Sequence, residues 1–388
     1  MANVLTDLAA DIYVAADIVG RELVGFIPAS TINADGSEAA AVGQTVRSFA
    51  TREAAAVDIT PAMTIPEGTD QTIDNKTLTI TKQRGVQIPY TGEDVRFLNG
   101  GAGYETVYGD QIAQAMRTLV NEMESDLATE AYTNASRAIG TAGTTPFASD
   151  FDLVAEGRQI LADNGMPTTD GRMSLVVNTA ASTKLRNLAS LSSVNQAGND
   201  TLLRQGTLLD LQGCMIKESA QVISHTKGAG TGGLINNGSG EAVGQTTLTL
   251  DTITVNTTGV LAGDVVTFAA DTTNKYVVNT GLVAVSGDIV IGDPGLLIAA
   301  PNNNAMTIGN SFTANVMMHQ KGLELAMRAP AKPTGGDAAV DVMIVQDPAS
   351  GLVFEISVYK GYNKAMIQVG CVWGYKAWNS DAIAIVMG

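Results

Sequence analysis

The sequence predicts an α+β protein that carries an inserted all-β module, and three observations support this prediction. Apolar residues between positions 104 and 138 recur every three or four residues, which indicates one long helix. The C-terminal region shows the shorter, extended pattern of strands, predicted at 340–346, 352–359, 366–376 and 382–387. Residues 226–310 are rich in Gly, Thr, Asn, Val and Ile, with the two-residue alternation of short strands.

The first hundred residues predict a helical arm followed by an extended hairpin. Residues 2–27 are expected to form one amphipathic helix or two short ones, ended by Pro28. The apolar positions at helical spacing are Leu5, Leu8, Ile12, Ala15, Ala16 and Val19. Residues 76–90, KTLTITKQRGVQIPY, alternate as two strands, and we expect the turn at Lys82-Gln83-Arg84-Gly85. The hairpin has little apolar surface, so we expect it to project from the body.

The long helix is the strongest predicted element. Its apolar stripe consists of Ile112, Met116, Leu119, Met123 and Leu127, and about thirty residues make a rod of roughly 50 Å at 1.5 Å per residue. Four acidic residues on this helix have the spacing of its exposed side, so we interpret them as a solvated face rather than as a catalytic pair in a cleft. They are Glu122, Glu124, Asp126 and Glu130.

The middle of the chain alternates helices and strands. A helix is predicted over 150–163, ending at Asn164-Gly165, and residues 172–190 read as a strand, a cap at Asn178 or Thr179, and a second helix. Short strands are expected around Leu208-Leu209 and Val222-Ile223. Residues 315–330, NVMMHQKGLELAMRAP, have a helix-like pattern.

The composition excludes some classes of function. The net charge is −16, with 23 Lys and Arg against 39 Asp and Glu, which argues against binding nucleic acid through phosphate contacts. Only 16% of residues are charged, so the surface is either covered by copies of the chain or rich in Thr, Asn and Gly. No secretory signal and no apolar run of ~18 residues is found, so we expect a soluble protein made in the cytoplasm, without a membrane partner. Cys214 and Cys371 are predicted to be buried free thiols rather than a disulfide.

One motif resembles a nucleotide site. In HTKGAGTGG, residues Gly228, Gly230 and Gly233 match the dinucleotide fingerprint G-x-G-x-x-G. That fingerprint must open a helix, and the following residues Leu-Ile-Asn-Asn-Gly-Ser-Gly cannot start one, so a flexible hinge is the preferred interpretation.

The remaining candidates for chemistry are few. The two histidines, His225 and His319, lie in no metal-binding or triad pattern, and His319 is interpreted as a packed or interface residue. The aromatic residues near the C-terminus are interpreted as core or sheet-face packing: Tyr359, Tyr362, Trp373, Tyr375 and Trp378. No residue is therefore assigned as catalytic, cofactor-binding or metal-binding, and no enzymatic activity and no cofactor are expected.

The order of elements resembles the major capsid proteins of tailed double-stranded-DNA bacteriophages, which share the HK-ninety-seven fold. Within this group the chain is most similar to P-twenty-two-type coat proteins, which carry an extra β-rich domain. The resemblance covers nearly the whole chain and rests on loose patterns. They are residues 86–132 (extended loop into the long helix), 173–191 and 201–222 (the central stretch), and 312–330 and 368–388 (the return from the insertion and the final strands).

The resemblance implies a division of the chain. Residues 1–35 would form an N-terminal arm, 36–98 an extended hairpin called the E-loop, and 99–150 the spine helix of the peripheral domain. Residues 151–226 would belong to the peripheral and axial domains, 227–308 to the β-rich insertion domain, and 309–388 to the axial domain and the closing peripheral strands.

The implied function is self-assembly into the icosahedral shell that encloses a tailed phage's double-stranded DNA. The implied partners are further copies in pentamers and hexamers, a separate scaffolding protein and a portal protein at one vertex, with DNA enclosed but not read. The protein would be found in the virion capsid after assembly in the cytoplasm of the bacterial host. An encapsulin-like shell of a cellular nanocompartment is the alternative, and an enzyme or a secreted adhesin fits less well. A further expectation is that deleting about 228–305 leaves the rest of the chain folded.

Overall fold

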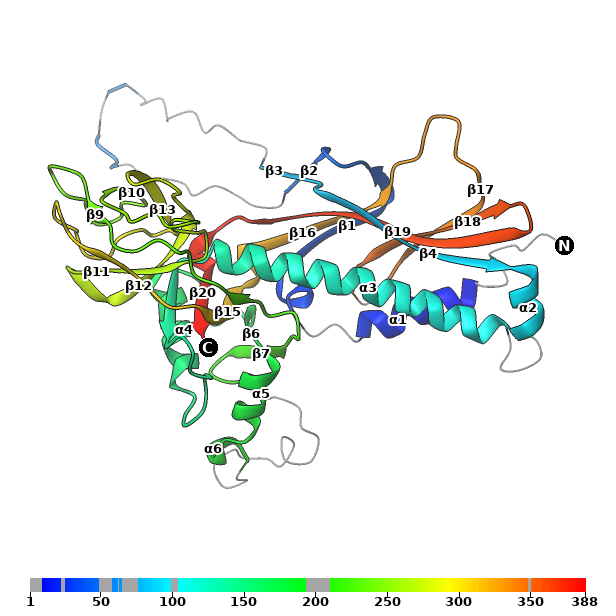
Figure 1. The fold of residues 1–388 in the computed structure, drawn as a ribbon, viewed down its shortest axis with the longest axis horizontal. Coiled ribbons are helices and arrows are strands. Elements are labelled where there is room, and N and C mark those ends of the chain that lie inside the picture. The colour runs from blue at the N-terminus through cyan, green and yellow to red at the C-terminus, as the bar shows by residue number, and fades with distance from the viewer. Residues whose placement is uncertain are drawn as a thin grey trace.

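The computed structural model describes residues 9–21, 25–48, 58–61, 63–64, 76–98, 104–192, 210–347 and 350–388. The chain forms an elongated part, which we call the long lobe, joined at one end to a second part, the compact lobe (Figure 1). A third group of strands, from residues 226–310, lies beside the compact lobe, and we call it the β module.

The long lobe is built on an antiparallel ribbon centred on β19 (Lys364–Ala377). On one edge, β4 (Lys82–Thr91) pairs with β19 along ten successive residues. The other edge is shared, because β18 (Val353–Gly361) pairs with the first half of β19 and β16 (Leu323–Pro330) with the second half. The outer strands β17 (Ala339–Gln346) and β1 (Thr31–Ala40) then pair with β18 and β16. The four predicted C-terminal strands are confirmed to within a few residues, the last being β20 (Ile383–Met387).

Two helices cover one face of this ribbon. Helix α3 (Tyr104–Thr133) runs lengthwise along it, and α1 (Ala9–Arg21) packs on α3 (Figure 1). The predicted stripe is confirmed, since all five of its members are at most 2% exposed: Ile112, Met116, Leu119, Met123 and Leu127. In α1 the predicted apolar positions Ile12, Ala15, Ala16 and Val19 are buried, whereas Leu5 and Leu8 lie outside the described residues.

The turn predicted at Lys82-Gln83-Arg84-Gly85 is wrong. These residues open the continuous strand β4, and Gly85 faces Gly370 in an unbroken register. The preceding strand β3 (Thr77–Thr79) pairs instead with β2 (Thr45–Arg47). Ten consecutive pairs with β19 outweigh a local turn preference, because tertiary pairing routinely overrides weak local signals. A short helix, α2 (Gly92–Leu98), follows β4.

The compact lobe contains a sheet in the order β7-β6-β15-β20-β5. Its strands are β5 (Arg137–Gly140), β6 (Met173–Val177), β7 (Cys214–Glu218), β15 (Phe312–His319) and β20, and β8 (Ser224–His225) pairs with β15. The predicted helices are confirmed as α4 (Asp152–Asp163) and α5 (Thr179–Arg186), and the Asn178 side chain caps α5 by accepting from the Ala181 N–H. Helix α6 (Ala189–Ser192) follows.

One prediction in this region fails. Residues 315–330 are strands β15 and β16 joined by a short 3-10 turn, not a helix. Both strands are buried on both faces, and a continuously apolar strand has no two-residue alternation to distinguish it from a buried helix. The short strand predicted around Val222-Ile223 is found at the next two residues, as β8. Leu208-Leu209 lies outside the described residues.

The β module has a hydrophobic cluster of its own. Its strands are β9 (Leu234–Ile235), β10 (Thr247–Asp251), β11 (Val265–Phe268), β12 (Asp271–Thr280), β13 (Gly287–Ile291) and β14 (Met306–Ile308). The module is also joined to the compact lobe, since β12 pairs with β5 through Lys275 and Tyr276. The all-β prediction for this segment is confirmed, and its sheet continues into that of its neighbour.

The chain passes between the two lobes at three places that lie together: 134–136, 320–322 and 378–382. The Ser136 backbone N–H and hydroxyl both donate to the Ile383 carbonyl oxygen, at 2.9 and 2.8 Å. The Trp378 N–H donates to the Gly322 carbonyl oxygen at 2.9 Å. These bonds tie the three crossings to one another.

Candidate functional site

The glycine motif forms no nucleotide cradle. Residues Leu234–Ile235, directly after Gly233, form the short strand β9, so the motif does not open a helix, as predicted. The Gly228 N–H donates to the Asp264 carboxylate at 3.0 and 3.2 Å, and the Gly230 N–H donates to the Gly259 carbonyl oxygen at 2.8 Å. The flexible-hinge interpretation is wrong, because both glycines are buried and a methyl group on Gly228 would collide with that carbonyl.

The two histidines are packing residues. His225 Nε2 lies 2.8 Å from Asp264 Oδ1, and its ring packs between Tyr132 and Phe312 at centroid distances of 5.4 Å. His319, fully buried, hydrogen-bonds to Asp170 Oδ2 at 2.9 Å, a bond that is the main reason why the pKa of Asp170 is lowered. Among the described residues, no group of three His, Cys, Asp or Glu side chains could hold a metal ion.

Both cysteines are buried free thiols, as predicted. Burial raises the pKa of Cys214 to about 11 and raises that of Cys371 as well. A protonated, buried thiol is a poor nucleophile. Neither cysteine therefore offers covalent chemistry in the folded chain.

The C-terminal aromatic residues divide into two groups. Trp373 is fully buried and donates its Nε1–H to Asp126 Oδ2 at 3.0 Å, which confirms core packing at that position. Tyr362, in the turn between β18 and β19, is 97% exposed, so the packing interpretation is wrong there. A turn residue has no sheet face to pack against.

The acidic residues of α3 are not a solvated face. Glu122 and Asp126 accept from Lys82 Nζ at 3.2 and 2.7 Å, so they join the helix to β4. Glu130 accepts from the Ala377 N–H at 3.0 Å, and burial raises its pKa. Glu124 is 5% exposed. The sequence correctly places all four carboxylates on the long helix, but it does not show their partners, which come from segments distant in the sequence.

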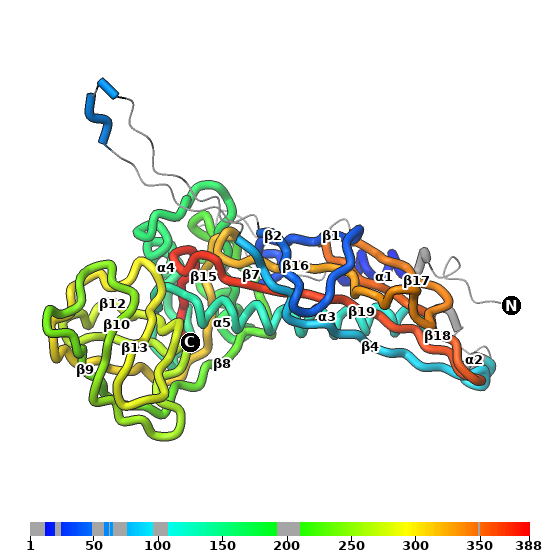
Figure 2. Tube along the Cα trace, turned by 90° about the horizontal axis from the view of Figure 1, so that it is seen from above, coloured from blue at the N-terminus to red at the C-terminus, as the bar shows by residue number. Residues whose placement is uncertain are grey.

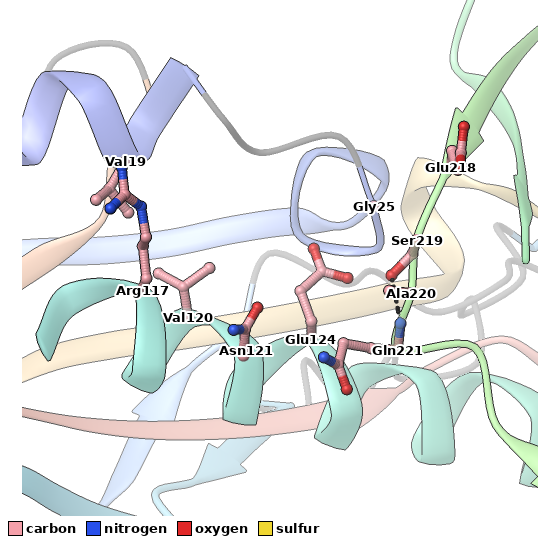
Figure 3. A pocket seen from close by; sticks show the side chains of 10 residues that line it. All are labelled: Val19, Gly25, Arg117, Val120, Asn121, Glu124, Glu218, Ser219, Ala220 and Gln221. Atoms are coloured by element: carbon pink, nitrogen blue, oxygen red, sulfur yellow. Dashed lines mark hydrogen bonds between the residues drawn. The ribbon is translucent and has the colours of Figure 1, made fainter. Parts of the chain in front are cut away.

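Glu124 lies at the base of a pocket of about 260 Å³ between α1, α3 and residues 218–221 (Figure 3). Its two oxygens accept from the backbone N–H groups of Phe26 and Ile27, at 2.7 and 2.9 Å. Burial raises the pKa of Glu124, and the two N–H donors act in the opposite direction by favouring the carboxylate.

Two further residues shape this contact. The half-buried side chain of Lys217 donates from Nζ to the Pro28 carbonyl oxygen at 2.7 Å, and desolvation lowers the pKa of Lys217. Gly25 leaves room for the carboxylate, because a Cβ there would lie 2.5 Å from Glu124 Oε2. The arrangement holds residues 25–30 on the long helix, and the Ser219 hydroxyl in the pocket lining also favours the Glu124 carboxylate. We therefore describe it as a clamp for the N-terminal segment, not as an active site.

Large apolar side chains are exposed at several places on the long lobe and beyond it. Ile59 and Met63 are 96% and fully exposed, and residues 58–61 and 63–64 stand well away from the body (Figure 2). Tyr13, Val14 and Ile18 of α1, and Val340, Val342 and Ile344 of β17, are at least 40% exposed. Exposed apolar residues gathered in this way are typical of protein–protein contacts. Among the described residues, no helix is both long and apolar enough to cross a membrane.

No family model and no curated protein matches this chain. Solved structures do match. The capsid of cyanophage P-SCSP1u aligns with a TM-score of 0.47 and 9% identity, over 94% of this chain and 88% of that chain. The mature capsid of bacteriophage PhiM1 gives 0.42 and 12%, over 94% and 87%, and the virus-like particle from Pyrococcus furiosus gives 0.40 and 9%, over 97% of each chain. At identities and TM-scores this low, the likeness by itself places the chain in no family.

Proposed function

We propose that this chain is a major capsid protein of HK-ninety-seven type, which self-assembles into the icosahedral shell around a tailed phage's double-stranded DNA. The observation that carries the proposal is the order of elements. An N-terminal segment lies on a thirty-residue helix, and β2 and β3 pair as a stem, with residues 58–61 and 63–64 standing away from the body. A compact lobe follows, and the last strands return beside the helix. This is the order that the sequence resemblance requires.

The surface supports a subunit that meets its own copies. Apolar side chains are exposed on α1, on β17 and at Ile59 and Met63, although the chain has a net charge of −16. Copies of such a chain repel one another, so they associate best through uncharged surface. The same negative charge lets enclosed DNA slide without adhering. Shells built from one subunit reuse each such contact by symmetry.

The β module is proposed as the insertion domain of a P-twenty-two-type coat protein, over residues 227–308. Its own cluster, which includes Ile235, Leu248 and Tyr276, supports this assignment. Its link to β5 changes the deletion experiment, because removing 228–305 takes away the neighbour of β5. We expect the shortened chain to fold and to show faster amide exchange in β5 and around His225, which loses its partner Asp264. Insoluble aggregate would show that the module is not a separate unit.

The remaining domain boundaries and partners follow from the same proposal. The arm is assigned to 1–35, the E-loop to 36–98, the spine helix to 99–150, the peripheral and axial segment to 151–226, and the closing axial and peripheral strands to 309–388. Pentamers and hexamers of the chain, a separate scaffolding protein and a portal at one vertex would complete the capsid, assembled in the host cytoplasm.

The deciding experiment is expression together with the genetic neighbours, followed by size-exclusion chromatography and electron microscopy. We expect closed shells of megadalton mass. A monomer of about 40 kDa that never assembles, with any scaffold or salt, would refute the proposal. Shells that hold a protein cargo in place of DNA would favour the nanocompartment alternative.

A further inference from the structure

A buried carboxylate lies beneath the stem of the extended loop. Glu324, on β16, is 2% exposed. It accepts from Trp378 Nε1 at 2.6 Å, from Asn33 Nδ2 at 3.0 Å and from the Ser48 hydroxyl. These three donors are neutral, so hydrogen-bond direction rather than charge pairing defines the arrangement.

The donors connect both strands of the stem to the sheet. Ser48 follows β2 and Lys76 precedes β3, and the Ser48 N–H donates to the Lys76 carbonyl oxygen at 2.8 Å. Lys76 Nζ lies 5.5 Å from the centroid of the Trp378 ring, and Lys376 Nζ lies 4.6 Å from it. The pair Glu324–Trp378 therefore touches the chain where it enters and where it leaves the segment 49–75.

The stem rests on a small hydrophobic cluster, separate from the main core. Its buried members are Ala40, Leu78, Ile80, Ala326 and Val372. The Ile80 N–H donates to the Gln44 carbonyl oxygen at 2.8 Å, and the Thr81 N–H donates to the Trp373 carbonyl oxygen at 3.0 Å. The stem is thus seated on β16 and β19 by packing as well as by the carboxylate.

We propose that Glu324 and Trp378 are positioning residues for assembly. They set the direction in which the stem leaves the sheet, and so the place where the exposed Ile59 and Met63 meet a second copy of the chain. The inference rests on the proposed function. An apolar residue at position 324 would leave the Trp378 and Asn33 donors without this acceptor, so the carboxylate holds these groups in one arrangement. A buried polar group with several directed bonds specifies one geometry, which is what a reused contact needs.

The test compares Glu324→Gln with Glu355→Gln. In Glu324→Gln, an NH2 group replaces one carboxylate oxygen. In one orientation of the amide this group faces the donor Asn33 Nδ2, and in the other it faces the donor Trp378 Nε1, so a hydrogen bond is lost in both cases. Glu355 is the control for changing a buried carboxylate to an amide, since it is 6% exposed and lies on the same sheet away from the stem. It accepts from Ser357 Oγ at 2.7 Å and from Lys332 Nζ at 3.2 Å, so its substitution also removes an ion pair and is the more severe of the two for stability. Ser48→Ala removes one donor with little risk to folding.

Three measurements are made on each full-length chain: thermal unfolding of the unassembled subunit, amide exchange in the stem, and the yield of closed shells by electron microscopy. For Glu324→Gln and Ser48→Ala we expect a folded subunit, faster exchange at the Ser48 and Ile80 amides, and about tenfold fewer shells, because a loosened segment must be ordered at every contact. Glu355→Gln should keep its shell yield.

Two results would overturn the inference: unchanged stem exchange in both stem variants, or faster stem exchange with a full yield of shells. If Glu324→Gln does not fold, Ser48→Ala alone decides between these results. If the wild-type chain itself never forms shells, the proposed function fails, and the inference fails with it. The experiment on the wild-type chain therefore distinguishes failure of the proposed function from failure of the inference alone.

Discussion

Gly25→Ala is predicted to release the N-terminal segment from the long helix. The new Cβ would lie 2.5 Å from Glu124 Oε2 and 2.9 Å from its Cδ, so the carboxylate has to move. Moving it breaks the bonds to the Phe26 and Ile27 N–H groups, which hold residues 25–30 in place. The backbone at Gly25 is outside the left-handed region, so alanine brings no conformational strain of its own.

The magnitude follows from two opposing effects. Each hydrogen bond to a charged acceptor contributes about 1.5–3 kcal/mol, so losing two costs about 3–6 kcal/mol. The displaced carboxylate regains water, which offsets part of that cost, and its raised pKa shows that burial disfavours the charge. Alanine also lowers the entropy of the unfolded chain, which contributes about 0.4–1 kcal/mol in favour of folding. We expect a net loss of about 2 kcal/mol for docking of this segment.

The assay is native-state hydrogen exchange at the Ala29 and Ser30 amides, which are bonded to the Phe26 and Ile27 carbonyl oxygens. A loss of about 2 kcal/mol corresponds to exchange about 30-fold faster. Gly92→Ala is the control, because a Cβ there meets nothing within 4 Å, and these amides should exchange as in the wild type.

A double-mutant cycle tests the reasoning itself. In a Glu124→Ala background the obstacle is gone, so Gly25→Ala should cost less than about 0.5 kcal/mol there. If Gly25→Ala costs the same with and without the Glu124 side chain, the collision with the carboxylate is not the cause.

Three further predictions concern buried groups. Gly228→Ala should destabilise the chain by about 1–3 kcal/mol in urea unfolding, because its methyl group meets a backbone carbonyl, whereas Gly238→Ala should stay within about 0.5 kcal/mol. Cys214 and Cys371 should react with an aromatic disulfide reagent at least ~100-fold more slowly in the native chain than in urea, and equal rates would contradict their burial. The folded state raises the pKa of Glu124 and so holds its proton more tightly than the unfolded chain does. The stability of the wild type relative to Glu124→Gln should therefore fall as the pH rises above the ordinary pKa of a Glu side chain, 4.5, and a rise would reverse the assigned shift.

The long helix could be predicted because one face is buried from Tyr108 to Tyr132. Ile112, Met116 and Leu119 face the sheet at a period that no strand can produce. Strands β15 and β16 could not be predicted in the same way. His319 and Leu323 are both fully buried within them, and a strand covered on both faces shows no period.

The clamp at Glu124 could not be predicted from local sequence. Its partner Phe26 is 98 residues away in the chain, and spacing along the helix shows only which residues share a side. The one signal in the sequence was the short apolar stretch around Pro28, because an apolar segment has to pack against another part of the chain. The same limit explains the turn predicted at Gly85, since the strand that pairs with it begins only at Lys364.

The three tied crossings between the lobes have a mechanical consequence. A two-lobed protein with one connecting strand bends at it, but here three chain segments, bonded at Ser136 and Trp378, share the joint. Bending one segment strains the others, so the lobes respond to load as one rigid body. In the proposed shell, we therefore expect curvature to arise from tilt between neighbouring subunits, and pressure from within to be carried along the β19 ribbon of the long lobe.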